Sequence, residues 1–242
     1  MRFIARLDIK NEYVIKGINL EGLRKIGDPL TIAKEYYQKK VDEIIFIDNV
    51  ASLYRRNNLF SIIEKSVKEI FIPITIGGGI RSLSDVEKCL ESGADKIAIN
   101  SYATENPKFI NDVSKRFGAS TIVSYIEAKK KFNNWEVYKY SGREPTGLQL
   151  DSWIKQVQEL GCGEILLTSV DYEGMQKGFD IEMVSKIYDY VKVPLIISGG
   201  CGRTNHIIDL IKDYNNCSVA IASALHYKKI DAKHNKILVT AN

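Results

Sequence analysis

The sequence predicts an α/β fold, a (β/α)8 TIM barrel, on three observations. Eight short runs rich in β-branched residues alternate with helix-length amphipathic segments along the 242 residues. Continuous apolar strands that alternate with helices are typical of a parallel sheet covered by helices. The strand and turn patterns also recur about 120 residues apart. An open, doubly wound sheet would not produce this repeat, and it usually carries a glycine-rich turn after its first strand, which is missing here.

The predicted elements follow one another in regular order. The strands are Phe3–Asp8, Glu43–Asp48, Ile74–Ile76, Lys96–Ile99, Thr121–Ile126, Glu164–Thr168, Leu195–Ile197 and Val219–Ile221. The helices between them are Leu30–Lys40, Leu59–Ile70, Leu83–Ser92, Pro107–Phe117, Leu150–Leu160, Ile181–Val191 and Asn205–Tyr214. Ala232–Asn242 lacks a clear helical period, so we expect the final helix to be shortened or replaced.

The repeat predicts two fused half-barrels, about residues 1–119 and 120–242, within one domain. Ile72–Gly79 corresponds to Val193–Gly200, and Asp42–Asp48 corresponds to the segment that begins at Gly163. No linker or low-complexity tract separates the halves. Each half therefore supplies four strands to a single barrel.

Composition limits the class of protein. The net charge of +4 comes from scattered residues, and we expect the densest run, Lys129–Lys131, to be a solvated loop that does not bind nucleic acid. No apolar run reaches the length of a membrane span. The four cysteines show neither disulfide nor zinc spacing, so we expect no metal and a reduced, cytoplasmic protein. Cys201, beside a glycine pair, is expected to be a small packing residue.

Paired glycine turns predict two phosphate sites. Gly78 and Gly79 follow the third strand, and Gly199 and Gly200 follow the seventh. Glycines at the carboxyl ends of barrel strands let backbone N–H groups approach a phosphate closely. The fourth and eighth strands add further donors through Asn100, Ser101, Ala222 and Ser223. Two such sites at one barrel mouth imply a substrate with a phosphate at each end.

Two carboxylates stand at corresponding places in the halves. Asp8 ends the first strand and Glu127 ends the fifth, and these strands lie opposite each other in an eight-stranded barrel. Two carboxylates across an anchored substrate can act as general acid and general base. The alternative is that both cap neighbouring loops.

Several motifs resemble the HisF family, the cyclase subunits of imidazole glycerol phosphate synthase. They are Val14–Asn19, Leu23–Pro29, Ile76–Arg81, Gly93–Lys96 and Gly163–Ser169, within a similarity that runs from residue 2 to about 231. The resemblance implies catalytic roles for Asp8 and Glu127. It also adds four residues to the substrate-binding set: Lys16, near the first loop, Ser141, Glu173 and Gly174.

The resemblance further implies a glutaminase partner of the HisH type, which forms a heterodimer at the N-terminal face of the barrel. Ammonia made from glutamine would pass along the barrel axis, and no other cofactor is implied. Arg2, Glu43, Lys96 and Glu164 match the charged residues that gate this route, and Asp95 matches an interface position. Two cations and two anions in one layer would satisfy one another.

The sequence departs from the family pattern near the carboxylates. Glu127 stands where the family has aspartate, and Glu173 replaces a second aspartate. By strand alternation, Arg6 and Tyr125 point into the barrel beneath Asp8 and Glu127, where the family has small residues. An arginine there would lower the pKa of Asp8.

Three hypotheses follow. The first is the cyclase, which would use ammonia to convert a bis-phosphorylated phosphoribulosyl-formimino aminoimidazole carboxamide substrate in histidine biosynthesis. The second is a HisF-like paralog that delivers ammonia to a sugar amidotransferase in surface polysaccharide biosynthesis. The third is a non-catalytic activator of a glutaminase.

Overall fold

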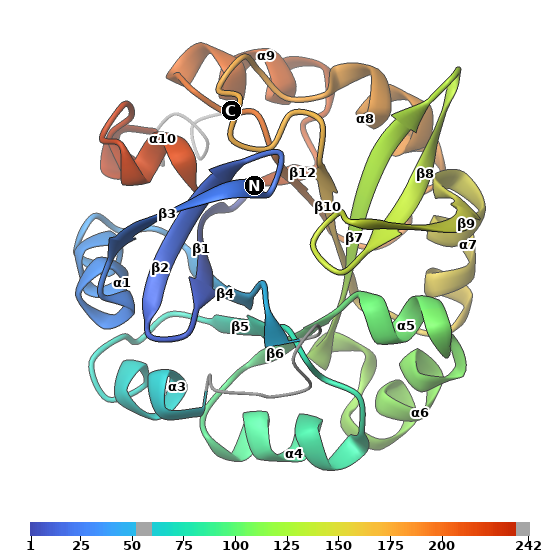
Figure 1. The fold of residues 1–242 in the computed structure, drawn as a ribbon, viewed down its shortest axis with the longest axis horizontal. Helices are drawn as coiled ribbons and strands as arrows, with labels where there is room; N and C mark the ends of the chain where they lie inside the picture. Colours follow the sequence, from blue (N-terminus) through green and yellow to red (C-terminus); the bar gives the residue numbers. More distant parts are fainter. Residues whose placement is uncertain (52–59, 236–242) are drawn as a thin grey trace.

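Eight parallel strands close into a barrel in the computed structural model, which describes residues 1–51 and 60–235 (Figure 1). Around the barrel they are β1 (Phe3–Lys10), β4 (Glu43–Asp48), β5 (Ile74–Gly77), β6 (Lys96–Ile99), β7 (Ile122–Lys131), β10 (Glu164–Ser169), β11 (Leu195–Ser198) and β12 (Cys217–Ile221). The pairing of β7 with β10 and of β12 with β1 completes the ring. The predicted fold class is confirmed, and every predicted strand is present.

Helices cover the outside of the barrel (Figure 1). They are α1 (Pro29–Gln38), α3 (Phe60–Ser66), α4 (Leu83–Glu91), α5 (Ser101–Glu105), α6 (Lys108–Phe117), α7 (Leu150–Glu159), α8 (Ile181–Ile187), α9 (Thr204–Asp213) and α10 (Ser223–His226). Two 3₁₀ turns, Ala119–Thr121 and Tyr188–Tyr190, follow α6 and α8. The predicted helix Ile181–Val191 therefore ends earlier as an α-helix, and Leu59 lies outside the described residues.

Helix starts follow local chemistry. Asp28 accepts a hydrogen bond of 2.8 Å from the Thr31 amide, and Pro29 occupies the first turn of α1, where its missing N–H is not needed. Ser82 and Asp85 form a reciprocal capping box at the start of α4. Near the C-terminus, residues 232–235 are helical, and the rest of the segment predicted to lack a regular helix lies outside the described residues.

Two antiparallel hairpins extend the barrel at its mouth, the end where the strand C-termini lie. The first is β2 (Tyr13–Ile18) with β3 (Glu21–Gly27), and the second is β8 (Asn134–Lys139) with β9 (Glu144–Gln149). They continue from β1 and β7, the strands that carry Asp8 and Glu127. The expectation that Lys129–Lys131 is a loop is wrong, because these residues belong to β7 and pair with β8.

The barrel interior has three layers, since alternate residues of each strand face inward. A charged ring of Arg2, Glu43, Lys96 and Glu164 lies at the N-terminal end. An apolar layer follows, made of Ile4, Ile45, Ala98, Val123, Leu166, Ile196 and Ala220. A buried polar layer lies at the mouth. The larger apolar cluster, which includes Leu7, Phe46 and Ile97, packs between strands and helices.

Candidate active site

Asp8 and Glu127 lie at the mouth on β1 and β7, which are four strands apart in the closed ring of eight. Both residues are 1% exposed. A buried carboxylate needs partners, because burial without them costs several kcal/mol. The partners of the two carboxylates differ, and this difference defines the chemistry of the site.

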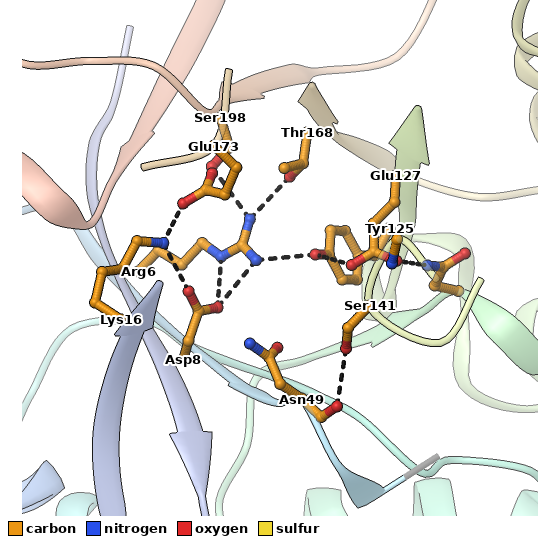
Figure 2. Close-up of polar contacts among 12 residues, drawn as sticks. Arg6, Asp8, Lys16, Asn49, Tyr125, Glu127, Ser141, Thr168, Glu173 and Ser198 are labelled. Atoms are coloured by element: carbon orange, nitrogen blue, oxygen red, sulfur yellow. Dashed lines mark hydrogen bonds and ion pairs between the residues drawn. The ribbon is translucent and has the colours of Figure 1, made fainter. Parts of the chain in front are cut away.

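Arg6 is the main partner of Asp8, as strand alternation predicted. The Arg6 Nε and Nη2 atoms both lie 2.9 Å from Asp8 Oδ1. Arg6 Nη1 donates to Thr168 Oγ1 at 2.8 Å and to Ser198 Oγ at 3.3 Å. Figure 2 shows the guanidinium at the centre of these contacts.

Lys16 holds the other oxygen of Asp8. Its Nζ lies 2.9 Å from Asp8 Oδ2 and also forms an ion pair with Glu173. Lys16 is 2% exposed and belongs to strand β2. The hairpin folds it over the mouth, where Asp8 and Glu173 compensate its charge (Figure 2).

Asp8 is held ionised. Burial alone would raise the pKa of Asp8, but the nearby Arg6 and Lys16 cations outweigh this and lower the pKa to about 2. This is the direction that the sequence predicted for Asp8 beside Arg6. The carboxylate is therefore available as a base or an electrostatic partner and not as an acid.

The pKa of Glu127 is shifted in the opposite direction to that of Asp8. Burial raises the pKa of Glu127, against the hydrogen bond from Tyr125, the Arg6 charge and the Gly142 amide. Oε1 accepts from the Tyr125 hydroxyl at 2.7 Å. Oε2 accepts from Asn100 Nδ2 at 2.9 Å and from the Gly142 amide at 3.0 Å. A carboxyl with a raised pKa is the better proton donor of the two.

One pocket lies beside Glu127 and is lined by six of the predicted catalytic and substrate-binding residues. They are Gly78, Gly79, Asn100, Ser101, Glu127 and Ser141. Gly78 has φ +108°, and a side chain there would meet the Asp48 carbonyl. Ser141 donates to the Asn49 carbonyl at 2.8 Å and joins the β8–β9 hairpin to the pocket wall.

A second pocket lies in the other half of the barrel. It is lined by the predicted residues Glu173, Gly174, Gly199, Gly200, Ala222 and Ser223. Gly199 and Gly200 have φ near +100°, a conformation that favours glycine. Among residues 1–51 and 60–235, the buried Ser223 hydroxyl has no hydrogen-bond partner. Each half of the chain thus contributes the glycines of one pocket, and the pocket of the first half lies beside Glu127 of the second half.

Known proteins match this chain over its length. The family model "Histidine biosynthesis protein" matches residues 2–231. An imidazole glycerol phosphate synthase subunit HisF of Legionella pneumophila is 51% identical over 204 residues, 84% of this chain and 96% of the relative. The HisF subunit of Pyrococcus furiosus is 40% identical, covering 100% of this chain and 96% of the relative. That of Lactococcus lactis subsp. cremoris is 44% identical, covering 93% and 88%.

The chain belongs to the HisF family. The predicted family and the predicted extent of the similarity are both confirmed. Each of these relatives is named as a subunit of imidazole glycerol phosphate synthase.

In this HisF family member the charged ring alternates in sign. Glu43 Oε2 lies 2.7 Å from Arg2 Nη1 and 2.8 Å from Lys96 Nζ. Glu164 forms an ion pair with Arg2 and lies 2.8 Å from Lys96 Nζ. A surface depression lined by Met1, Arg2, Lys96 and Glu164, among others, opens there. Asp95, next to the ring, accepts from the Ile74 amide at 2.8 Å.

Sequence reasoning missed several site residues. Thr168 and Ser198, in the C-terminal parts of β10 and β11, accept hydrogen bonds from Arg6. Strand alternation from Glu164 would place Thr168 inward. Arg81 and Tyr102 line the first pocket, where Arg81 supplies a cation two residues after Gly79. The Ile-Arg that follows the glycines was visible in the sequence, but its side chain direction was not.

The four cysteines are all free and buried. Burial raises the pKa of Cys201 to about 12, which fits the predicted packing role. In residues 1–51 and 60–235, no cluster of three or more His, Cys, Asp or Glu side chains is arranged to hold a metal. Within the same ranges no helix is long and apolar enough to cross a membrane.

Proposed function

We propose that this chain is the cyclase subunit of an imidazole glycerol phosphate synthase, an ammonia-dependent lyase of histidine biosynthesis. The observation that carries the proposal is a barrel mouth with two glycine-lined pockets and two buried carboxyl groups. The pKa of one carboxyl, Asp8, is lowered, and the pKa of the other, Glu127, is raised. The names of its HisF relatives support the same activity. The substrate would be the bis-phosphorylated phosphoribulosyl-formimino aminoimidazole carboxamide precursor.

Each phosphate would bind one pocket. Backbone N–H groups at Gly78–Gly79 and Gly199–Gly200 can approach phosphate oxygens because these residues have no side chain. Arg81 adds a positive charge to the first pocket only. Fixing both ends would hold the reacting centre across the mouth, between Asp8 and Glu127, and positioning of this kind supplies a large part of catalysis.

Asp8 and Glu127 would then take different proton-transfer roles, one as acceptor and one as donor. Ammonia brings protons that must leave as it attacks the substrate, and the ionised Asp8 can accept one. The departing carboxamide fragment needs a proton, and Glu127, with its raised pKa, can donate it. Glu173 and Lys16 would bind the substrate near the second pocket. Their ion pair joins the β2–β3 hairpin to this part of the site.

We also propose a glutaminase partner that docks at the N-terminal face and supplies ammonia, with no other cofactor. The charged ring at that face and Asp95 beside it support this proposal. The four cysteines are all free and buried, which supports a reducing compartment such as the cytoplasm.

A second candidate is favoured by one observation. Arg6 and Tyr125 fill the barrel beneath the carboxylates, where ammonia would emerge, and this supports ammonia delivery to a different acceptor or a role as glutaminase activator. The acceptor class would be a sugar amidotransferase.

The test is direct. Purified protein is given the cyclase substrate and an ammonium salt, and product is followed. We expect turnover that falls by about 10²-fold or more in Asp8→Asn. The matched control is Asp42→Asn, at the opposite end of the barrel, where Asp42 accepts from the Phe3 amide. No turnover, with glutamine hydrolysis by a partner stimulated, would favour the second candidate.

A further inference from the structure

Arg6 contacts the acid–base pair without belonging to it. The side chain is 0% exposed and its hydrogen bonds reach side chains on four strands: Asp8 on β1, Tyr125 on β7, Thr168 on β10 and Ser198 on β11. Five N–H donors in a rigid plane can hold several acceptors at once in fixed geometry. Arg6 therefore ties β1 to the opposite wall of the barrel.

Tyr125 extends this contact to the second carboxyl. Its hydroxyl accepts from Arg6 Nη2 at 2.9 Å and donates to Glu127 Oε1 at 2.7 Å. A continuous chain of hydrogen bonds thus runs from Asp8 through Arg6 and Tyr125 to Glu127 (Figure 2). It crosses the barrel, because β1 and β7 lie on opposite sides.

We propose that Arg6, acting partly through the Tyr125 hydroxyl, is the positioning residue that fixes Asp8 as the ionised base and orients Glu127 as the acid. The proposal rests on the proposed cyclase function and deepens it. With Oε1 held by Tyr125, the Oε2 atom of Glu127 is directed toward Asn100, Gly142 and the first pocket.

The count of buried charges supports this division of roles. Arg6 and Lys16 are two buried cations, and Asp8 and Glu173 balance them through direct ion pairs. Glu127 is then a third carboxyl with no ion pair of its own among the described residues, so burial favours its neutral form. Removing Arg6 would leave Lys16 alone against Asp8 and Glu173, and one of the carboxyls would take up a proton.

Other charged and titratable groups face Asp8 from several neighbouring elements. Lys16 faces it from β2, Glu173 from the segment after β10, and Tyr125 and Glu127 from β7. The Asp8 charge also acts on His226 of α10, where it raises the pKa against the larger lowering by burial. Asp48 of β4 lies in register with Ile9, the residue after Asp8. Arg6 and Lys16 are the cations that contact Asp8 directly.

The test compares three variants in the full chain: Arg6→Met, Arg6→Lys and Tyr125→Phe. The pH dependence of kcat/KM is measured with excess ammonium salt. In Arg6→Met we expect the acidic limb to move upward by about one pH unit or more. Arg6→Lys should restore part of this shift. Tyr125→Phe should lower kcat by up to about 10²-fold, the scale expected for a misplaced acid, and leave KM within about threefold because the phosphate pockets are unchanged.

A structural role for Arg6 would give a different result. It would lower activity by the same factor at every pH, and an unshifted acidic limb in Arg6→Met would overturn the proposal. Binding of inorganic phosphate shows whether Arg6→Met is folded. If it is not, the acidic limb of Arg6→Lys and the kcat of Tyr125→Phe test the positioning role instead.

A second readout separates this proposal from the proposed function. The carboxyl groups are labelled with ¹³C and titrated by NMR, with Asp8→Asn and Glu127→Gln used for assignment. We expect Asp8 to stay ionised to the acid limit of folding in the parent and to titrate at higher pH in Arg6→Met. If the parent shows no turnover but this titration moves, the cyclase function fails and the positioning role stands. An unmoved titration overturns the role.

Discussion

At the scale of residues, the site contains two carboxyls made unequal by their neighbours. Asp8 has two cations in direct contact, whereas Glu127 accepts only neutral donors. Both are equally buried, so burial cannot explain the difference. Asp8 has its pKa lowered and Glu127 has its pKa raised because the charges beside them differ.

Asp8 should make stability depend on pH in acid. Its folded-state pKa of about 2 is below the ordinary 3.8, so its ion pairs stabilise the fold fully above pH 3.8, and this contribution is lost as pH falls toward 2. The lost term is about 2 kcal/mol, at about 1.4 kcal/mol for each pH unit. In Asp8→Asn we expect lower stability at pH 7 and a flatter decline between pH 4 and pH 2.

Urea unfolding at a series of pH values measures this effect, since the midpoint reports stability when the slope is constant. Asp42→Asn is the control for loss of one carboxylate elsewhere. An Asp8→Asn protein that declines as steeply as the parent between pH 4 and pH 2 would show that Asp8 is not held by Arg6 and Lys16.

The sequence could predict part of this residue-scale picture. Asp8 with Arg6, and Glu127 with Tyr125, are two residues apart on a strand, so alternation alone places each pair on one face. The contacts of Arg6 with Thr168 and Ser198 join residues more than 160 positions apart. They depend on the order and register of the closed barrel, which local patterns do not contain.

At the scale of elements, each half of the chain adds a hairpin after its first strand. The β2–β3 hairpin brings Lys16 to Asp8, and the β8–β9 hairpin brings Ser141 to the first pocket and the Gly142 amide to Glu127. The hairpins were not predicted from the sequence, because their apolar stretches are short and interrupted by polar residues. Their stability comes from pairing with strands that the barrel already fixes.

Gly200 should be needed for the second pocket. It has φ +98°, and a side chain there would collide with the Gly178 carbonyl. We expect Gly200→Ala to weaken binding of the substrate by 10-fold or more, on the order of the 1.4 kcal/mol that one decade represents, and to lower the free energy of unfolding by about 1 kcal/mol or more through backbone strain.

Gly147→Ala is the matched control. Gly147 also has a positive φ, +78°, but nothing lies within 4 Å of an added side chain. It should show backbone strain and little change in binding. Isothermal titration with inorganic phosphate and urea unfolding measure the two effects, and equal loss of binding in both variants would contradict a specific role for Gly200.

At the scale of the whole molecule, the barrel separates two polar ends. The charged ring lies at the N-terminal face, the polar layer lies at the mouth, and apolar side chains such as Leu166 and Ile196 lie between them. The repeat in the sequence was sufficient to predict the closed barrel and the two pockets. It could not show that the mouth is bridged, because the bridge joins residues that differ between the halves, Arg6 and Tyr125.

The two ends should be separable by mutation. Lys96 Nζ lies 2.8 Å from both Glu43 and Glu164, and it is partly exposed at the N-terminal face. Lys96→Met would leave these two carboxylates facing each other with Arg2 as their remaining cation in the ring. We expect a cost of about 1–3 kcal/mol in stability, the range for a buried polar group that loses its partner.

The effect on activity should depend on the source of ammonia. If ammonia enters at the ring from a glutaminase partner, Lys96→Met should reduce glutamine-dependent turnover several-fold and leave turnover with ammonium salt unchanged, because the mouth is intact. Asp8→Asn should reduce both. Lys115→Met, on the exposed surface of α6, is the control for loss of a lysine. Paired assays with glutamine plus partner and with ammonium salt measure the ratio. A Lys96 variant that loses both activities in proportion would mean that the ring acts only through stability of the barrel, and the route along its axis would then have no support from these residues.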